Sequence, residues 1–318
     1  LPADPGPNHD GGILVLGPPA TPPGGIGDGA PLYVVIGDLN RNGQLENFAA
    51  GAPPDDTGVI LRVQQDGTPF PGNPFTPYCA ETTSQTCSNN GDCPPGEACR
   101  TEVARYWSYG VRNSFGMALD PVTGFLWDTE NGPQLYDEVN LAQAGFNSGW
   151  EDVMGPAGSP SPPGLWNVPG AGNTYSEPEF SWLDTTAPTA ILFPWGSDLG
   201  AGFDDVALVG DSNSGQIYRL PLNGARDGFD FTAFPALLDL VADDNSERDL
   251  LSFGTGFGAV TDLEIGPDQA LYVVSLTRGA IYRASGTQAI FADGFESGDT
   301  SAWTAVRRGA PERFAVQT

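Results

Sequence analysis

The stretch Asp205-Val-Ala-Leu-Val-Gly-Asp-Ser-Asn-Ser-Gly-Gln-Ile-Tyr-Arg-Leu220 consists of an aliphatic run, a turn rich in polar and glycine residues, and a second run containing Ile-Tyr-Arg. The same plan returns as Ala270-Leu-Tyr-Val-Val-Ser275, followed after its turn by Ala280-Ile-Tyr-Arg283. Short apolar runs bounded by turn residues are typical of β-strands. The repeated strand–turn–strand phrase therefore predicts two copies of one β unit.

Two earlier segments resemble the first half of this phrase. They are Pro31-Leu-Tyr-Val-Val-Ile-Gly-Asp38 and Gly124-Phe-Leu-Trp-Asp-Thr-Glu130. Similar β units that recur roughly every 60 to 90 residues are typical of propeller blades with long loops between them. A β-sandwich would also give short strands, but not this recurring phrase. We predict an all-β fold, a β-propeller over residues 1–286.

The composition narrows the range of functions. The 43 glycines and 30 prolines favour turns over helices, and the formal net charge is −27, with arginine as the only strongly basic residue. Nucleic acid and anionic membranes are poor partners for such a chain, because phosphate binding needs a basic surface. The carboxylates could attract calcium or could form an acidic coat that maintains solubility.

Several features predict a secreted or periplasmic bacterial protein. No apolar run reaches the roughly 20 residues that a membrane-spanning helix needs. The sequence starts at Leu1 rather than Met, which predicts the loss of a signal peptide or a longer N-terminal region. Residues 287–318 resemble the C-terminal sorting segments of secreted bacterial proteins.

Four cysteines lie in residues 76–104, a stretch with little aliphatic content that reads as an insertion in the propeller. Their spacing lacks the paired Cys-x-x-Cys of a zinc site, so we predict two disulfides that staple a surface loop. All three pairings remain open. The cysteines are Cys79, Cys87, Cys93 and Cys99.

The middle of the chain resembles the glucose/sorbosone dehydrogenase family. The resemblance spans about residues 7–285 and is carried most strongly by four segments. These are Tyr109-Gly-Val-Arg-Asn-Ser-Phe-Gly-Met-Ala-Leu-Asp120, Trp127-Asp-Thr-Glu-Asn-Gly-Pro133, Asp137-Glu-Val-Asn-Leu141 and Gly145-Phe-Asn-Ser-Gly-Trp150. The family comprises six-bladed propellers, many of which use pyrroloquinoline quinone (PQQ) with calcium. The resemblance therefore implies a sugar or aldose dehydrogenase.

The resemblance also implies roles for particular residues. His9, the only histidine, is expected to be the general base, and Asp38 is expected to orient it. Arg112 and Asn113 are expected to lie along the quinone, where Arg112 stabilises the reduced oxygen, and Gln44 is a further candidate contact. Read without the family, His9 could be incidental and Arg112 a structural ion-pair partner.

A calcium site is predicted around residues 130–140. Acidic and amide side chains are dense there, and a hard cation favours such oxygen ligands. The alternative is a solvated acidic loop. The predicted side-chain ligands are Glu130, Asp137, Glu138 and Asn140, and the resemblance adds the backbone carbonyls of Gly132 and Pro133.

The chain departs from the family pattern in two respects. Asn213 stands where the resemblance implies a lysine, and residues 258–263 contain no cation where arginine is expected, although Arg278 lies in a neighbouring turn. Only about four blade phrases are visible, whereas the resemblance implies about two more blades before His9. An incomplete propeller has open sheet edges, which favour self-association.

These departures leave three functional hypotheses. The leading one is a PQQ-dependent sugar dehydrogenase. The alternative is a non-catalytic extracellular propeller that has lost quinone binding and binds an extracellular polymer for adhesion or assembly. A hydrolytic calcium propeller, such as a lactonase, is the third.

Overall fold

The computed structural model describes residues 8–18, 29–172, 174–286, 288–294, 304–306 and 314–315. The chain divides into two compact units. The first comprises Leu1–Ser114 and Ala142–Pro178, and the second comprises Phe115–Leu141 and Glu179–Thr318. None of the helices in these described ranges has the length and apolar character of a membrane span.

The first unit contains one antiparallel sheet of four strands in the order β1-β2-β3-β6. Its strands are rich in Val, Ile, Leu and Tyr, which pack well on a pleated surface. The core beneath it includes Val59, Tyr106 and Tyr109, and Val168 from the second segment of the unit packs there too. The strands are β1 (Leu14–Leu16), β2 (Leu32–Ile36), β3 (Val59–Val63) and β6 (Tyr106–Tyr109), and the 3₁₀-helix η1 (Gln44–Glu46) follows β2.

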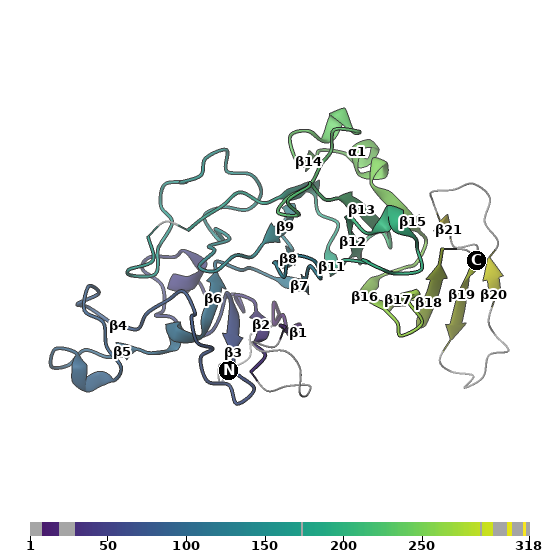
Figure 1. The fold of residues 1–318 in the computed structure, drawn as a ribbon. Coiled ribbons are helices and arrows are strands. Elements are labelled where there is room, and N and C mark those ends of the chain that lie inside the picture. Colours follow the sequence, from purple (N-terminus) through teal and green to yellow (C-terminus); the bar gives the residue numbers. More distant parts are fainter. Residues whose placement is uncertain are drawn as a thin grey trace. The chain divides into compact units, whose positions relative to one another are not determined.

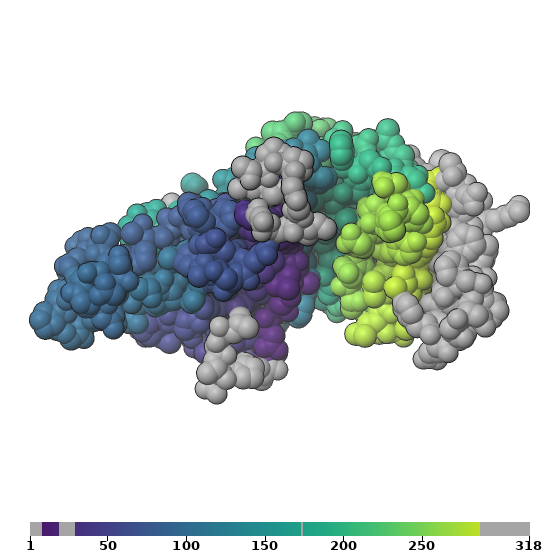
Figure 2. All heavy atoms as spheres, turned by 60° about the horizontal axis from the view of Figure 1, so that its bottom comes forward, coloured from purple at the N-terminus to yellow at the C-terminus, as the bar shows by residue number. Residues whose placement is uncertain are grey.

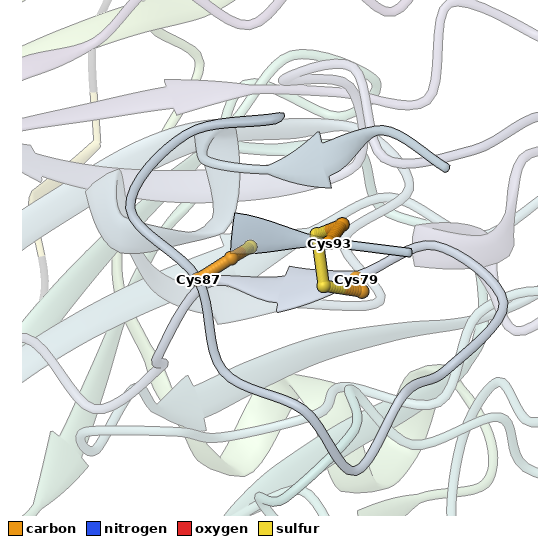
Figure 3. Close-up of side chains that lie close together, drawn as sticks. All are labelled: Cys79, Cys87 and Cys93. Atoms are coloured by element: carbon orange, nitrogen blue, oxygen red, sulfur yellow. A yellow bond between two sulfur atoms is a disulfide. The ribbon is translucent and has the colours of Figure 1, made fainter. Parts of the chain in front are cut away.

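The cysteine-rich insertion forms a small two-stranded hairpin, β4 (Tyr78–Cys79) with β5 (Cys99–Arg100), followed by the short helix η3 (Glu102–Arg105). The 3₁₀-helix η2 (Asn90–Asp92) lies in the loop that connects the two strands in sequence. The predicted pair of disulfides is confirmed. Cys79 is bonded to Cys93, as Figure 3 shows, and Cys87 is bonded to Cys99. The first cysteine thus pairs with the third and the second with the fourth.

The second unit contains three five-stranded sheets. Each is built mainly from strands that are consecutive or nearly so in the sequence and antiparallel, as in propeller blades (Figure 1). The first sheet, in the order β14-β10-β9-β8-β7, comprises β7 (Ser114–Leu119), β8 (Leu126–Glu130), β9 (Leu135–Leu141), β10 (Phe180–Asp184) and β14 (Val241–Ala242). The second, in the order β11-β12-β13-β15-β21, comprises β11 (Pro188–Leu192), β12 (Val206–Asp211), β13 (Ile217–Pro221), β15 (Ser252–Thr255) and β21 (Phe314–Ala315). The third, in sequence order, comprises β16 (Val260–Ile265), β17 (Leu271–Ser275), β18 (Ala280–Ser285), β19 (Gln288–Gly294) and β20 (Thr304–Val306).

The repeated phrase of the sequence occupies the same place in every sheet. Its aliphatic run forms β2, β8, β12 and β17, which are each the second strand of their sheet. The Ile-Tyr-Arg run forms the third strand, as β13 and β18, and pairs antiparallel with the strand before it. The repeat thus marks inner strands of the four large sheets, each of which pairs with a neighbouring strand on both sides. Short helices η4 (Ala201–Phe203), η5 (Pro235–Leu237) and α1 (Asn245–Leu250) lie in the loops.

Candidate functional site

The candidate site of the first unit forms where β2 ends, at Gly37 and Asp38. The backbone nitrogen of Asp38 donates to the Arg112 carbonyl at 2.9 Å. A Cβ atom on Gly37 would lie 2.3 Å from the His9 carbonyl oxygen and 2.6 Å from that of Arg112. Glycine is therefore required here, because it allows three segments distant in sequence to meet.

Asp38 is the centre of a short hydrogen-bond chain. Its Oδ1 lies 2.7 Å from Nδ1 of His9, and its Oδ2 accepts from the indole Nε1 of Trp150 at 2.7 Å. The His9 side chain is 9% exposed and that of Asp38 is 5% exposed. A carboxylate at Nδ1 favours the neutral tautomer with its proton there and leaves Nε2 as the proton acceptor. The geometry is that of an oriented general base.

Trp150 connects this chain of hydrogen bonds to Arg112. The Arg112 guanidinium carbon lies over the Trp150 ring, 5.0 Å from its centroid. The structure thus brings together His9, Asp38 and Arg112 as the resemblance implies, with Asn113 half-buried beside Arg112 in the chain. Gln44 lies in η1, where its amide donates to the Ala49 carbonyl at 3.4 Å and so is directed at its own loop.

Trp150 ends one of the segments that carry the family resemblance, but no role for it was predicted from the sequence. It is held in place by a buried amide pair that joins two loops 100 residues apart. Asn147 Nδ2 donates to Asn47 Oδ1 at 2.8 Å, and Asn47 Nδ2 donates to Asn147 Oδ1 at 3.0 Å and to the Trp150 carbonyl at 2.7 Å. Asn47 and Asn147 therefore position the tryptophan from its backbone side.

Glu46, next to Asn47, is a buried acid behind the site. Its carboxylate accepts from the Gly43 nitrogen and, at 3.0 Å, from the Thr57 hydroxyl, and its carbonyl accepts from the Glu151 nitrogen at 2.7 Å. Burial raises the pKa of Glu46 to about 8, against smaller opposing effects of these two donors. Glu46 is therefore protonated in the folded protein at neutral pH.

The raised pKa of Glu46 predicts a pH dependence of stability. Between its ordinary pKa of 4.5 and about 8, the folded state holds a proton that the unfolded state has lost. The contribution of Glu46 to the free energy of unfolding is therefore full below pH 4.5. It falls as the pH rises from there to about 8. Glu46→Gln, which imitates the protonated acid, is expected to flatten this decline. Urea unfolding at several pH values will test this, and an unchanged slope in the variant would contradict the assignment.

The predicted metal-binding segment of the second unit forms an acidic face on β8 and β9. Glu130 stands directly opposite Glu138, and Asp128 stands opposite Asn140, so these four side chains share one face of the sheet. All four are at most 2% exposed. The Asn140 amide donates to Glu130 at 3.3 Å and to Glu138 at 3.2 Å. Like charges placed opposite each other repel, so this face favours a bound cation.

Asp137 points to the other face and has different partners. Its carboxylate accepts from the backbone nitrogens of Gly132 at 2.8 Å, Thr186 at 2.6 Å and Ala187 at 2.7 Å. It therefore holds the turn that contains Gly132 and the exposed Pro133. Asp128 is not among the predicted ligands, although the alternation along β8 places it on the same face as Glu130.

Among the described side chains, the one group of three or more possible metal ligands consists of cysteines. Cys79, Cys87 and Cys93 bring their sulfur atoms within 4.8 Å of one another, but all three are in disulfides and so are not thiolate ligands. No three carboxylates in these parts of the chain place one oxygen each within that distance. The acidic face thus supplies suitable donors that are not drawn together around one point.

The structure also places Arg278 within the second unit. A Cβ on Gly258 would lie 3.0 Å from Cγ of Arg278, and one on Gly215 would lie 2.5 Å from the Gly258 carbonyl oxygen. The guanidinium of Arg278 donates to the Gly256 carbonyl at 3.4 Å. Arg278 therefore lies beside the loop of Asn213 and the segment that begins at Gly258, the two places where the family resemblance implies cations.

Comparison with known proteins supports the predicted family. A family model described as glucose/sorbosone dehydrogenase matches residues 82–283. The aldose sugar dehydrogenase YliI of Escherichia coli K12 is 28% identical over 280 residues, which are 84% of this chain and 57% of that protein. Quinoprotein glucose dehydrogenase B of Acinetobacter calcoaceticus is 30% identical over 162 residues, 46% of this chain and 27% of that protein.

A solved structure confirms the fold. The PQQ-bound aldose sugar dehydrogenase of Streptomyces coelicolor aligns with a TM-score of 0.52 at 23% identity, covering 85% of this chain and 57% of that chain. The sheets described above are therefore β-propeller blades, as predicted. This chain spans about half the length of that protein and of the E. coli relative, and about a quarter of the length of the Acinetobacter relative.

Proposed function

Because the chain belongs to the glucose/sorbosone dehydrogenase family, we propose that it oxidises a sugar or aldose with PQQ. The observation that carries the proposal is the series of hydrogen bonds that links His9 through Asp38 to Trp150. The bonds on both sides of the Asp38 carboxylate are 2.7 Å long. This series provides an oriented base in a nearly buried position, which proton removal from a sugar hydroxyl requires.

The residues of this chain have the following roles in the proposed reaction. Nε2 of His9 accepts the proton of the sugar hydroxyl, and Asp38 stabilises the resulting imidazolium. The guanidinium of Arg112, fixed over Trp150, stabilises developing negative charge on an oxygen beside it. PQQ, when bound, would accept the hydride from the sugar carbon that carries this hydroxyl.

The described residues fit a polyanionic quinone in part. In the first unit, the Arg112 guanidinium lies over the Trp150 ring and supplies a positive charge beside the His9 site. In the second unit, Arg278 is the cation beside Asn213 and residues 258–263, which carry none of their own.

The deciding experiment is a titration of the purified protein with PQQ, followed by quinone absorbance and by dye reduction with a panel of aldoses. We expect saturable binding and sugar-dependent dye reduction. Arg112→Ala is expected to weaken binding about 10- to 100-fold, the equivalent of one charge-assisted hydrogen bond of about 1.5–3 kcal/mol. Arg283→Ala, which removes the cation of the surface pair with Asp268, is the matched control. Absence of binding at high micromolar PQQ would contradict the proposal.

Calcium is proposed as a second ligand, held by the acidic face of Asp128, Glu130, Glu138 and Asn140. The face fits by chemistry, because all its donors are oxygen atoms and all four residues are buried. Calcium bound there would offset the repulsion between the like charges of Glu130 and Glu138. The backbone carbonyls of Gly132 and Pro133 remain proposed ligands on the grounds of the family resemblance.

Calcium is therefore expected to stabilise the fold. At a concentration 100 times its Kd, a ligand specific for the folded state adds about 2.7 kcal/mol to the free energy of unfolding. The midpoint of thermal unfolding should rise with calcium and return with chelator, and Glu138→Gln should abolish the rise. Glu81→Gln, on the exposed cysteine loop, should leave it intact. A rise that survives Glu138→Gln would place the ion elsewhere.

We further propose that the protein works outside the cytoplasm, because disulfides persist in oxidising compartments. The second candidate function is a non-catalytic extracellular propeller that binds a polymer. It is favoured by the loop of Asn213 and the segment 258–263, which lack cations of their own. Failure of the quinone titration would support this candidate.

A further inference from the structure

The disulfide insertion forms one wall of a cavity of about 660 Å³ in the first unit. The rest of the lining comes from the glycine- and proline-rich loop at residues 167–171 and from Pro74 and Phe75. The insertion, coloured blue, lies at the surface in Figure 2. A volume of this size is in the range of small-molecule sites.

The lining is uncharged and rich in hydroxyl groups. Thr76, Thr83, Ser84 and Thr86 contribute hydroxyls and Asn167 an amide, and none of the described residues that line the cavity is charged. The chain as a whole carries 40 acidic residues, so an uncharged lining is a local departure from its composition. A charged ligand would lose its hydration here without gaining a counter-charge in the lining.

The Asn167 side chain has unused hydrogen-bonding capacity. Its Oδ1 atom is buried and has no hydrogen-bond partner among the described residues, and its Nδ2 reaches the Leu165 carbonyl only at 3.5 Å. A buried acceptor without a donor is unfavourable. Rotation of the Asn167 amide toward the cavity would allow a ligand hydroxyl to donate to Oδ1 and recover this free energy.

The wall that carries the hydroxyls is held firmly. Residues 83–86 lie within the loop that the Cys79–Cys93 disulfide closes, and they directly precede Cys87, which is bonded to Cys99. Backbone bonds join Cys79 to Gln85 at 2.9 Å and Cys87 to Pro77 at 3.2 Å, and the Glu97 carboxylate accepts from the nitrogen and hydroxyl of Thr82. Such preorganisation lowers the entropy lost on binding.

We infer that this cavity binds a neutral saccharide. Hydroxyl and amide groups match the alternating donors and acceptors of a polyol, while the half-buried Pro74 and Pro169 offer apolar surface to its CH groups. Phe75 and Tyr78 are each only 4% exposed, which leaves little ring face for an aromatic ligand to stack on. The site is distinct from the His9 site and requires no quinone.

Isothermal titration of the full chain without PQQ will test the inference, with maltose and cellobiose as neutral probes and glucuronic acid and glucosamine as charged ones. A neutral disaccharide is expected to saturate the protein, and the charged sugars to bind at least 10-fold more weakly. Ser84→Arg, which puts a cation in the lining, should weaken binding at least 10-fold. Ser88→Arg, on the same loop but outside the lining, should leave it unchanged, and intact disulfides verify the fold of both variants.

Two results would overturn the inference. One is the absence of saturation by any neutral probe at about 10 mM, well above a millimolar Kd. The other is equal affinity of the wild type and Ser84→Arg. Because the measurement is made without PQQ, neither result depends on the quinone titration, and failure of that titration leaves this binding test intact.

Discussion

His9→Ala is expected to lower the turnover number for sugar oxidation by about 10²–10⁴-fold, the usual contribution of a positioned general base. Binding of PQQ should be unchanged, since the imidazole acts on the sugar hydroxyl. The measurement is dye reduction at saturating sugar, together with a quinone titration of the same variant. A variant that retains wild-type turnover would show that His9 is not the base.

Trp150→Phe tests the hydrogen-bond chain behind His9. Phenylalanine keeps a ring beneath Arg112 but removes the N–H that donates to Asp38 at 2.7 Å. Loss of one hydrogen bond to a charged acceptor, about 1.5–3 kcal/mol, corresponds to about a 10- to 100-fold fall in turnover if the bond acts fully in the transition state. Trp107→Phe is the matched control, because it removes an indole bond of the same length, to the Ala142 carbonyl.

A readout independent of turnover is available because His9 is the only histidine of the chain. The ¹⁵N spectrum of the imidazole therefore reports one residue. Since Nδ1 lies 2.7 Å from Asp38, the neutral ring should carry its proton on Nδ1 in the wild type and lose that preference in Asp38→Ala. A proton on Nε2 in the wild type would contradict the proposed base, even if the chain shows no turnover for other reasons.

Much of the fold could be predicted because its sheets are local. The repeated phrase forms the second strand of each sheet, and antiparallel neighbours follow in sequence, so the pattern reports the architecture directly. The parallel pairing of β14 with β10 carries no such signal, because it joins segments separated by about 60 residues of loop and strand. The disulfide pairing was equally beyond prediction, because three connectivities fit the same four cysteines.

The candidate site was predicted in part. His9, Asp38 and Arg112 meet because Gly37 has no side chain, and the family resemblance was the only signal for their proximity. The role of Trp150 depends on Asn47 and Asn147. The hydrogen bonds between these two residues could not be predicted from their spacing in the sequence. In contrast, Asp128 could have been found, because strand alternation places it on the same face as Glu130.

Arg226→Ala is expected to lower the free energy of unfolding by about 3–5 kcal/mol, since it leaves a buried carboxylate without its partner. Arg226 and Asp120 form a two-pronged pair, with Nε 2.7 Å from Oδ2 and Nη2 2.8 Å from Oδ1, and their side chains are 6% and 0% exposed. Arg283→Ala is the control, because the pair of Arg283 with Asp268 is exposed and worth about 0–1 kcal/mol. Urea unfolding of both variants measures the difference, and equal losses would contradict the assignment.

The same pair should also shape the stability of the protein in acid. Burial by itself would raise the pKa of Asp120, but hydrogen bonds from Arg226, from the Thr123 hydroxyl and from the Val122 nitrogen outweigh it and lower the pKa below 3.8. The unfolded state therefore takes up a proton at this position before the folded state does. The contribution of the pair is full above about pH 4 and is lost as the pH falls through the lowered pKa. Arg226→Ala removes the main cause of the lowering, so its free energy of unfolding should fall less steeply below pH 4 than that of the wild type.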